Sequence, residues 1–287
     1  MTVTIPPNAS LVGRDGPQTR ATTRSAGGPR HRAWVEQIMG MPITVQVRGT
    51  AVREDPALAA TAEACVRELF ADLRDVDARF SPYRPDSEIS RLQRGELTLR
   101  ECSDDVVAVE GLCRTALERT HGAFDAWACV PGRPGVFDPT GLVKSWGVGR
   151  AARRLAPLTD AGVSWAVNAG GDILVRCAPD DEPWLVGVED PADRSRVLAT
   201  IPVRDGAVAT SGLAARGAHI VDPRSGTPAT DVLAATVVGP SFVWADVWAT
   251  VLVVEGEKAP EVAGSIHGAA GMIIYRGGRV HRWVNPV

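Results

Sequence analysis

The stretch His219–Thr250 reads HIVDPRSGTPATDVLAATVVGPSFVWADVWAT, and the rest of the chain is organised around it. An Asp-Pro turn leads through a β-branched run, which predicts a strand over residues 231–238, into a helix that Ser241 can cap. Residues four apart share one face of a helix, so Asp246 and Thr250 would direct a carboxylate and a hydroxyl at one point. Both groups are hard oxygen ligands that Mg²⁺ accepts. The stretch therefore predicts half of a metal site on a helix.

The same pair has an ordinary interpretation, in which the threonine bonds to its own backbone beside a solvated aspartate. The neighbouring residues argue against it. Trp244, Val247 and Trp248 make the helix apolar on most sides, which is typical of a buried helix. A buried carboxylate needs a partner. This context favours the ligand pair.

Composition excludes several classes of function. The chain has 287 residues, 45% of them hydrophobic, which suffices for one large core or two small ones. Its net charge of −3 gives no basic surface for nucleic acid and no polybasic membrane anchor. No apolar run approaches the roughly 18 residues of a membrane span. We expect a soluble protein that binds neither nucleic acid nor membranes.

The cysteines indicate a reducing compartment. The five are scattered and form no CxxC motif, and Cys65 and Cys113 fall on apolar helix faces. Free structural thiols are therefore expected rather than a disulfide framework, and the predicted location is cytoplasmic. The first residues also lack the apolar core of a secretory signal.

The N-terminal third is predicted as a tail followed by a strand and two helices. Residues 1–32 are rich in Thr, Ser, Gly, Pro and Arg and are expected to be a disordered tail, with a single domain over 33–287. Residues 35–49 are interpreted as one strand interrupted near Gly40. Asp55 and Pro56 open a long helix, and Ser103 caps a second one.

Two loops stand out. Residues 121–149 contain several glycines and are predicted to be mostly irregular, with a helix from Trp146 to about Leu158; such a loop lets backbone N–H groups approach a ligand. Tyr83 lies between two prolines in a loop after the long helix. Its ring could stack on a planar ligand or cover the edge of the core, and the residues alone favour the second.

The remaining chain is predicted to be mostly strands. Residues 165–177 are interpreted as one strand kinked at Gly170 and Gly171, and further strands are expected at 184–188, 197–203 and 206–212. A short helix near 259–266 precedes two final strands. Because the strands follow one another without regular helical crossovers, the predicted class is α+β.

Short motifs appear in a fixed order along the chain. They are Met39-Gly40; Phe80-Ser81 with Tyr83 and Ser87-Glu88; Gly122-Ala123-Phe124-Asp125; Asp138 with Lys144; Asn168 with Gly170-Gly171-Asp172; Ala209-Thr210-Ser211-Gly212; His219 with Asp222-Pro223 and Gly226; and Ala245-Asp246 with Thr250. Together they resemble the ApbE family of FAD:protein FMN transferases, over roughly Met39–Val254.

The resemblance implies a fold of mostly antiparallel sheets flanked by helices, and a transferase. Such an enzyme uses Mg²⁺ to split the pyrophosphate of FAD. It attaches the FMN half through a phosphoester bond to a Thr or Ser hydroxyl of an acceptor flavoprotein and releases AMP. The implied ligands are therefore FAD, as a substrate, and Mg²⁺.

The resemblance also implies roles for particular residues. Flavin- and adenosine-contacting positions map onto Met39, Tyr83, Ala123, Phe124, Asp125 and Asp138. Asp246 and Thr250 map onto metal ligands, with the backbone carbonyl of Gly141 as a third. His219 lies beside the dinucleotide and competes with Asp246 as the base. Lys144 belongs to the phosphate side of the predicted dinucleotide site, and the hydroxyl of Ser211 could hold either the phosphates or the adenosine.

Three positions depart from the family pattern. Met41 stands where a Thr is usual, Gly141 replaces a common Ala, and Ser145 follows Lys144 where Gly is usual. The last change would make the backbone near the phosphates less accessible. Two alternatives therefore remain: a Mg²⁺-dependent FAD pyrophosphatase that uses water as acceptor, and a FAD-binding protein without catalysis.

Overall fold

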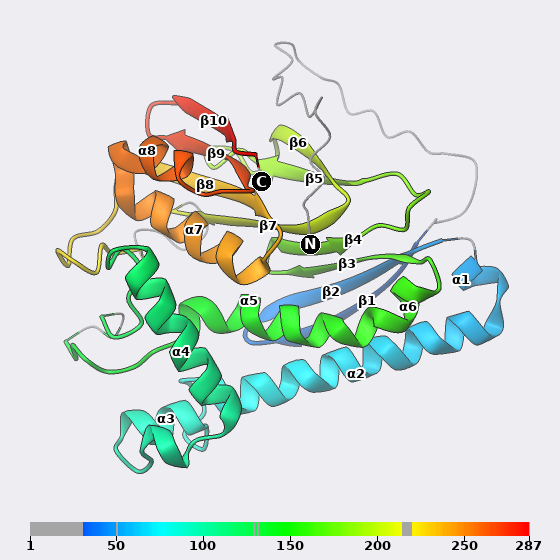
Figure 1. Cartoon of the computed structure of the whole chain (residues 1–287), viewed down its shortest axis with the longest axis horizontal. Coiled ribbons are helices and arrows are strands. Elements are labelled where there is room, and N and C mark those ends of the chain that lie inside the picture. The colour runs from blue at the N-terminus through cyan, green and yellow to red at the C-terminus, as the bar shows by residue number, and fades with distance from the viewer. Residues whose placement is uncertain (1–30, 50, 129, 131, 214–219, 287) are drawn as a thin grey trace.

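The computed structural model describes residues 31–49, 51–128, 130, 132–213 and 220–286. A sheet in the order β1-β2-β3-β4-β7-β8-β9-β10 forms its centre, and every pairing in this sheet is antiparallel. Helices cover one face of the sheet, and a separate ribbon, β5-β6, covers the other (Figure 1). The strands are β1 His31–Ile38, β2 Met41–Arg48, β3 Ser164–Ala169, β4 Asp172–Arg176, β5 Trp184–Glu189, β6 Val197–Val203, β7 Asp205–Gly212, β8 Val232–Gly239, β9 Ala270–Tyr275 and β10 Val280–Val284.

The helices fall mainly between β2 and β3 and between β8 and β9. They are α1 Ala51–Glu54, α2 Pro56–Phe80, α3 Glu88–Gln93, η1 Leu99–Glu101, α4 Asp104–Arg119, α5 Thr140–Ala151, η2 Ala152–Leu155, α6 Ala156–Asp160, α7 Phe242–Glu255, η3 Gly256–Lys258 and α8 Ala259–Gly264. In the part of the chain that the structure describes, no helix is both long and apolar enough to cross a bilayer.

Two segments that were each predicted to be a single strand form hairpins in the structure. β1 and β2 pair from His31 opposite Arg48 to Ile38 opposite Met41, so the chain reverses at Met39 and Gly40. Both turn residues have positive φ, 55° and 72°, as two-residue hairpin turns that match the strand twist require. The predicted interruption of one strand is therefore wrong. β1 also begins at His31, inside the stretch expected to be a tail.

The double glycine of the second hairpin has the same effect. Gly170 and Gly171 have φ of 65° and 106°, and β3 turns there into β4, with Ala169 opposite Asp172. We expected a kink within one strand over 165–177. The reversal brings Asp172 back onto the sheet, next to β7.

The helix starts follow local hydrogen bonds. Asp55 Oδ1 accepts from the backbone N–H groups of Ala57 at 2.8 Å and Leu58 at 3.3 Å, and α2 begins as predicted. Ser103 is the N-cap of α4, but its hydroxyl makes no capping bond and is buried without a hydrogen-bond partner among the residues that the structure describes. Its own N–H instead donates to Glu88 at 2.6 Å.

α5 begins six residues earlier than the predicted start at Trp146. Pro139 precedes it, and Asp138 Oδ1 accepts from the N–H of Thr140 at 3.0 Å. The glycines within the segment had argued against a helix, since each glycine disfavours one. The earlier start places Gly141 and Lys144 in a helix rather than in a loop.

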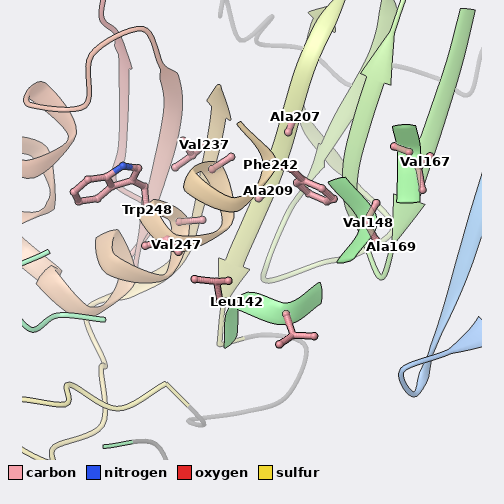
Figure 2. Packing of buried hydrophobic residues seen from close by; sticks show 14 of the residues in the cluster. Leu142, Val148, Val167, Ala169, Ala207, Ala209, Val237, Phe242, Val247 and Trp248 are labelled. Atoms are coloured by element: carbon pink, nitrogen blue, oxygen red, sulfur yellow. The ribbon is translucent and has the colours of Figure 1, made fainter. Parts of the chain in front are cut away.

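α5 and α7 pack together on one face of the sheet. Figure 2 shows Leu142 and Val148 of α5 and Val247 and Trp248 of α7 gathered around buried strand residues. Those strand residues include Val167, Ala169, Ala207, Ala209 and Val237. The small alanines of β7 leave room for α7, which contacts both β7 and β8.

A second cluster of buried side chains lies on the opposite face, beneath β5-β6. It contains Ala166, Val175, Val186, Val188, Ile201, Val203, Val208, Ala234, Val238, Met272 and Ile274. Alternate residues of the central strands thus face two different cores. Cys65, Cys102 and Cys177 are free thiols, Cys113 is buried in the first core, and Cys129 lies outside the described residues.

Candidate functional site

α7 carries the two predicted metal ligands. The helix begins where the sequence predicts, with Ser241 Oγ accepting from the N–H of Trp244 at 3.4 Å. Asp246 is 5% exposed, so it is not the solvated aspartate of the ordinary interpretation. Thr250 follows one turn later. Its hydroxyl is 2.9 Å from Ser211 Oγ, which brings another predicted site residue to the same helix face.

A lysine lies between two buried aspartates. Lys144 Nζ lies 3.4 Å from Asp246 Oδ1 and donates a hydrogen bond to Asp172 Oδ2. The other oxygen of Asp172 accepts from the N–H of Thr210 in β7 at 2.7 Å. These bonds connect α7, α5, β4 and β7 at a single point. The ammonium of Lys144, which we assigned to the dinucleotide phosphates, is thus engaged by two carboxylates here.

The second carboxylate oxygen of Asp246 is buried and has no hydrogen-bond partner among the described residues. Buried polar atoms are nearly always bonded, because desolvation without a partner costs free energy. An unpartnered carboxylate oxygen beside an ammonium is therefore a position at which a ligand is expected.

Burial controls the ionisation of this group. Burial raises the pKa of Asp246 from 3.8 to about 6; the ammonium of Lys144 opposes this rise, and the charge of Asp172 adds to it. For Lys144, burial alone would lower the pKa, but Asp246 and Asp172 outweigh it, and the pKa is raised. Lys144 is therefore charged at neutral pH, and Asp246 can take up a proton more readily than an ordinary aspartate.

Two predicted site segments meet at the start of α5. The ring of Phe124 lies against the backbone of Gly141, where an added Cβ would be 3.4 Å from two ring atoms. Phe124 and Ala123 are both buried, and the N–H of Phe124 donates to Thr120 Oγ1 at 3.0 Å. The predicted carbonyl ligand and the predicted flavin-contacting segment are thus neighbours in space.

The two predicted acidic contacts shape the loop between α4 and α5. Asp125 Oδ1 accepts from the N–H of Trp127 at 2.7 Å, just as Asp138 Oδ1 accepts from that of Thr140. The N–H of Asp138 donates to the carbonyl of Ala126 at 2.7 Å, which joins the two ends of the loop. Both carboxylates hold local turns, and both residues are only partly buried.

The two methionines of the first hairpin lie against glycines. Met39 Cε would be 3.5 Å from a Cβ on Gly147 of α5. Met41 Sδ would be 3.0 Å from a Cβ on Gly170, so the residue that departs from the family pattern covers the β3-β4 turn. Tyr83 is 93% exposed, and the expectation that it covers the core edge is wrong.

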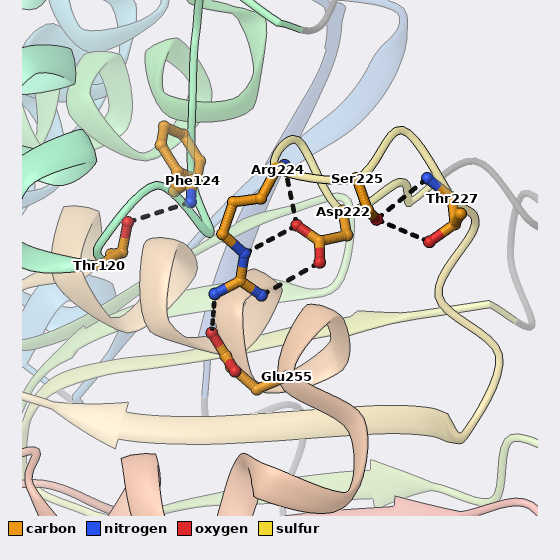
Figure 3. Close-up of polar contacts among 7 residues, drawn as sticks. All are labelled: Thr120, Phe124, Asp222, Arg224, Ser225, Thr227 and Glu255. Carbon is orange, nitrogen blue, oxygen red and sulfur yellow. Dashed lines mark hydrogen bonds and ion pairs between the residues drawn. The ribbon is translucent and has the colours of Figure 1, made fainter.

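The loop after β7 contains a contact that sequence reasoning missed. His219, the competing base, lies outside the described residues. Further on, Arg224 bonds both carboxylate oxygens of Asp222 and also Glu255 at the end of α7 (Figure 3). No local pattern relates Arg224 to Glu255. Asp172 was also given no role, although it stands in the Gly170-Gly171-Asp172 motif.

The sequence model of the ApbE family matches residues 39–129 and 132–273. The chain is similar to proteins named FAD:protein FMN transferase. The one from Klebsiella pneumoniae (strain 342) is 28% identical, with 79% of this chain and 81% of the relative covered. The one from Haemophilus influenzae is also 28% identical, with 77% and 81% covered.

Solved structures share the fold. The ApbE protein of Thermotoga maritima superposes with a TM-score of 0.71 at 22% identity, covering 88% of this chain and 96% of that one. The flavin transferase ApbE of Vibrio cholerae gives 0.70 at 23% identity, covering 89% and 97%. The predicted α+β fold of antiparallel sheets flanked by helices is thereby confirmed. By its sequence and its fold, the chain belongs to the ApbE family.

Proposed function

We propose that this chain is a FAD:protein FMN transferase that attaches FMN to a Thr or Ser hydroxyl of an acceptor protein and releases AMP. The observation that carries the proposal is the buried Oδ2 of Asp246, which has no hydrogen-bond partner among the described residues, while Oδ1 of the same carboxylate lies 3.4 Å from Lys144 Nζ. The chain belongs to a family whose relatives bear that activity in their names.

The donor set fits Mg²⁺. The described residues contain no cluster of three or more His, Cys, Asp or Glu side chains that could hold a metal. Asp246, the hydroxyl of Thr250 and the carbonyl of Gly141 would instead supply three oxygens, and Mg²⁺ commonly keeps water or phosphate in its remaining positions. When bound, the ion would neutralise charge on the pyrophosphate. The ammonium of Lys144 is compatible with this because Asp172 balances it.

The transfer needs positioning and one proton acceptor. A bond forms between the acceptor oxygen and the phosphorus of FMN as the pyrophosphate bond to AMP breaks, and the hydroxyl proton must leave. Asp246 can receive it, since its pKa is raised to about 6, although a metal-bound carboxylate is a weaker base. His219 is the other candidate.

The remaining site residues would bind the dinucleotide. Tyr83 offers an exposed planar ring for the flavin, and Lys144, whose ammonium is paired with Asp172 and Asp246, would lie on the phosphate side. The assigned contacts are Met39, Tyr83, Ala123, Phe124, Asp125, Asp138, Lys144, Ser211 and His219.

Incubation with FAD, Mg²⁺ and a candidate acceptor tests the proposal. Flavin fluorescence that stays on the acceptor after denaturation, together with one AMP per flavin, is the expected result. Free FMN with AMP would identify a pyrophosphatase instead. Bound FAD without either product would identify a binding protein and contradict transfer.

Variants test the metal assignment. Asp246→Ala and Thr250→Val each remove one oxygen ligand, and each should lower Mg²⁺-dependent AMP release by at least ~100-fold, the scale of losing a group that positions reacting atoms. Thr159→Val is the control, because it removes a hydroxyl that bonds Trp165 outside the site, at 2.9 Å. Release unchanged by the first two variants would exclude these ligands.

A further inference from the structure

Arg224 joins segments that are far apart in the sequence. Its Nε and Nη2 donate to the two oxygens of Asp222 at 2.9 and 3.1 Å, and its Nη1 donates to Glu255 Oε1 at 2.7 Å (Figure 3). The first contact is bidentate, the geometry in which a guanidinium holds a carboxylate most firmly. The loop is also braced internally, since the N–H of Gly226 donates to the carbonyl of Asp222 at 2.8 Å.

The aliphatic part of Arg224 reaches a third segment. A Cβ on Gly122 would lie 3.4 Å from Arg224 Cγ and 3.7 Å from its Cδ, so the side chain lies over the backbone of that glycine. Gly122 has φ +81°, a conformation that favours glycine. It directly precedes Ala123 and Phe124, and Thr120 holds the same turn through the N–H of Phe124 (Figure 3).

The contact between Arg224 and Glu255 fixes the end of α7. Glu255 is the last residue of this helix, five positions after Thr250, and its side chain is only 11% exposed. The hydrogen bond from Arg224 also holds the pKa of Asp222 below its usual range, so Asp222 stays ionised at neutral pH. The guanidinium of Arg224 thereby bonds the carboxylates of both Asp222 and Glu255 and offsets part of their negative charge.

We propose that Arg224 is a positioning residue that sets the spacing between the Gly122–Phe124 segment and α7. It touches no substrate in this role, and the inference rests on the proposed function, in which these two elements bind FAD and its metal. Partly exposed ion pairs such as Arg224 with Asp222 contribute about 0–1 kcal/mol to stability, so this pair alone has little value for folding. A shift of ~1 Å between catalytic elements can nevertheless cost ~100-fold in rate.

The chain supplies a matched control in Arg154. Its Nε and Nη2 bond both oxygens of Asp72 at 2.8 and 3.1 Å, and its Nη1 lies 3.3 Å from Glu68, so it has the same pattern of partners as Arg224. Its contacts join η2 to α2, and none of them involves a predicted site residue.

The experiment compares Arg224→Met and Arg224→Lys with Arg154→Met in the full chain. The readouts are the dissociation constant for FAD from flavin fluorescence in EDTA, KM for FAD and kcat in Mg²⁺, and the melting temperature. For Arg224→Met we expect the dissociation constant and the KM for FAD to rise about tenfold, with a melting temperature that stays well above the assay temperature. Arg224→Lys should recover only part of the FAD affinity that Arg224→Met loses, because an ammonium cannot make the bidentate contact.

The FAD affinity and KM of Glu255→Gln should lie between those of wild type and Arg224→Met, since glutamine keeps a hydrogen-bond acceptor but loses the charge. FAD affinity and KM of Arg224→Met within twofold of Arg154→Met would overturn the inference, as would a loss of binding that only follows a loss of folded protein. A wild-type chain that binds no FAD would contradict the proposed function as well. Normal FAD binding by both wild type and Arg224→Met would contradict this inference alone.

Discussion

At the scale of single residues, the centre of the site is a lysine shared by two buried carboxylates. Asp172 and Asp246 are 4% and 5% exposed, and Lys144 lies between them. Two carboxylates buried this close to one another repel, and the ammonium between them offsets that repulsion. One oxygen of Asp246, which has no hydrogen-bond partner among the described residues, stays available to a ligand.

The raised pKa of Asp246 predicts a pH-dependent stability. The folded pKa of about 6 exceeds the unfolded value of 3.8, so the folded state holds the proton more tightly. The stabilisation of the folded state by this tighter proton binding is fully present below pH 4, falls as the pH rises to about 6 and is lost above that. Asp246→Asn cannot take up this proton. Between pH 4 and pH 7, its free energy of unfolding should therefore rise relative to that of wild type by on the order of 2–3 kcal/mol.

Urea denaturation of both proteins in EDTA measures this difference, since bound metal would favour the ionised carboxylate. Titrating groups remote from Asp246 are common to the two proteins and cancel in the comparison, so the difference reports Asp246 together with Lys144, which is coupled to it. A difference that does not change with pH would show that Asp246 ionises as an ordinary aspartate.

At the scale of elements, helix starts place the site residues. Ser241 and Ser103 are both N-cap residues, but only Ser241 accepts a backbone hydrogen bond through its hydroxyl. The N–H of Ser103 is bonded by Glu88 instead. Two serines at equivalent N-cap positions thus contribute differently to helix capping. The difference depends on whether a side chain from a neighbouring element supplies a hydrogen-bond partner.

Ser241→Ala should therefore lower the free energy of unfolding by about 1 kcal/mol, the usual loss of a capping oxygen. Ser103→Ala is its matched control and should change stability by less than about 0.5 kcal/mol, because no capping bond is lost. Ser241→Asp should restore the loss, since a carboxylate caps and complements the helix N-terminus. Equal losses in both alanine variants, measured in urea, would contradict the difference in capping.

At the scale of the whole molecule, one sheet separates two cores. The helices and the predicted site lie on one face, and the β5-β6 ribbon closes the other. Ile201 of the ribbon is 7% exposed and belongs to the second core, whereas Val197 on the same strand is 61% exposed. Stability contributed by the ribbon can therefore change without any change in the site.

Ile201→Ala should lower the free energy of unfolding by about 2–5 kcal/mol, because it leaves a cavity in the second core. Val197→Ala should stay within about 0.5 kcal/mol of wild type. KM for FAD, measured well below the melting temperature, should not change in either variant. An altered KM in Ile201→Ala would show that the two faces of the sheet are coupled.

The sequence by itself determined the helix of Asp246, its cap at Ser241, most strands and the family. These follow from features within a few residues of one another: apolar periodicity, capping side chains and short motifs. The transferase class agrees with the names of the curated relatives. Mg²⁺, AMP release, the acceptor hydroxyl, the role of His219 and the cytoplasmic location stay predictions.

Only the tertiary structure decided how these pieces meet. A glycine pair such as Gly170-Gly171 fits a kink or a reversal equally well, and strand pairing selects the reversal. The early start of α5 depends on Asp138, whose own position is set by a backbone bond to Ala126. The bonds from Lys144 to Asp172 and from Arg224 to Glu255 join residues about thirty positions apart. Such contacts have no local pattern, because they exist only once the sheet has brought distant segments together.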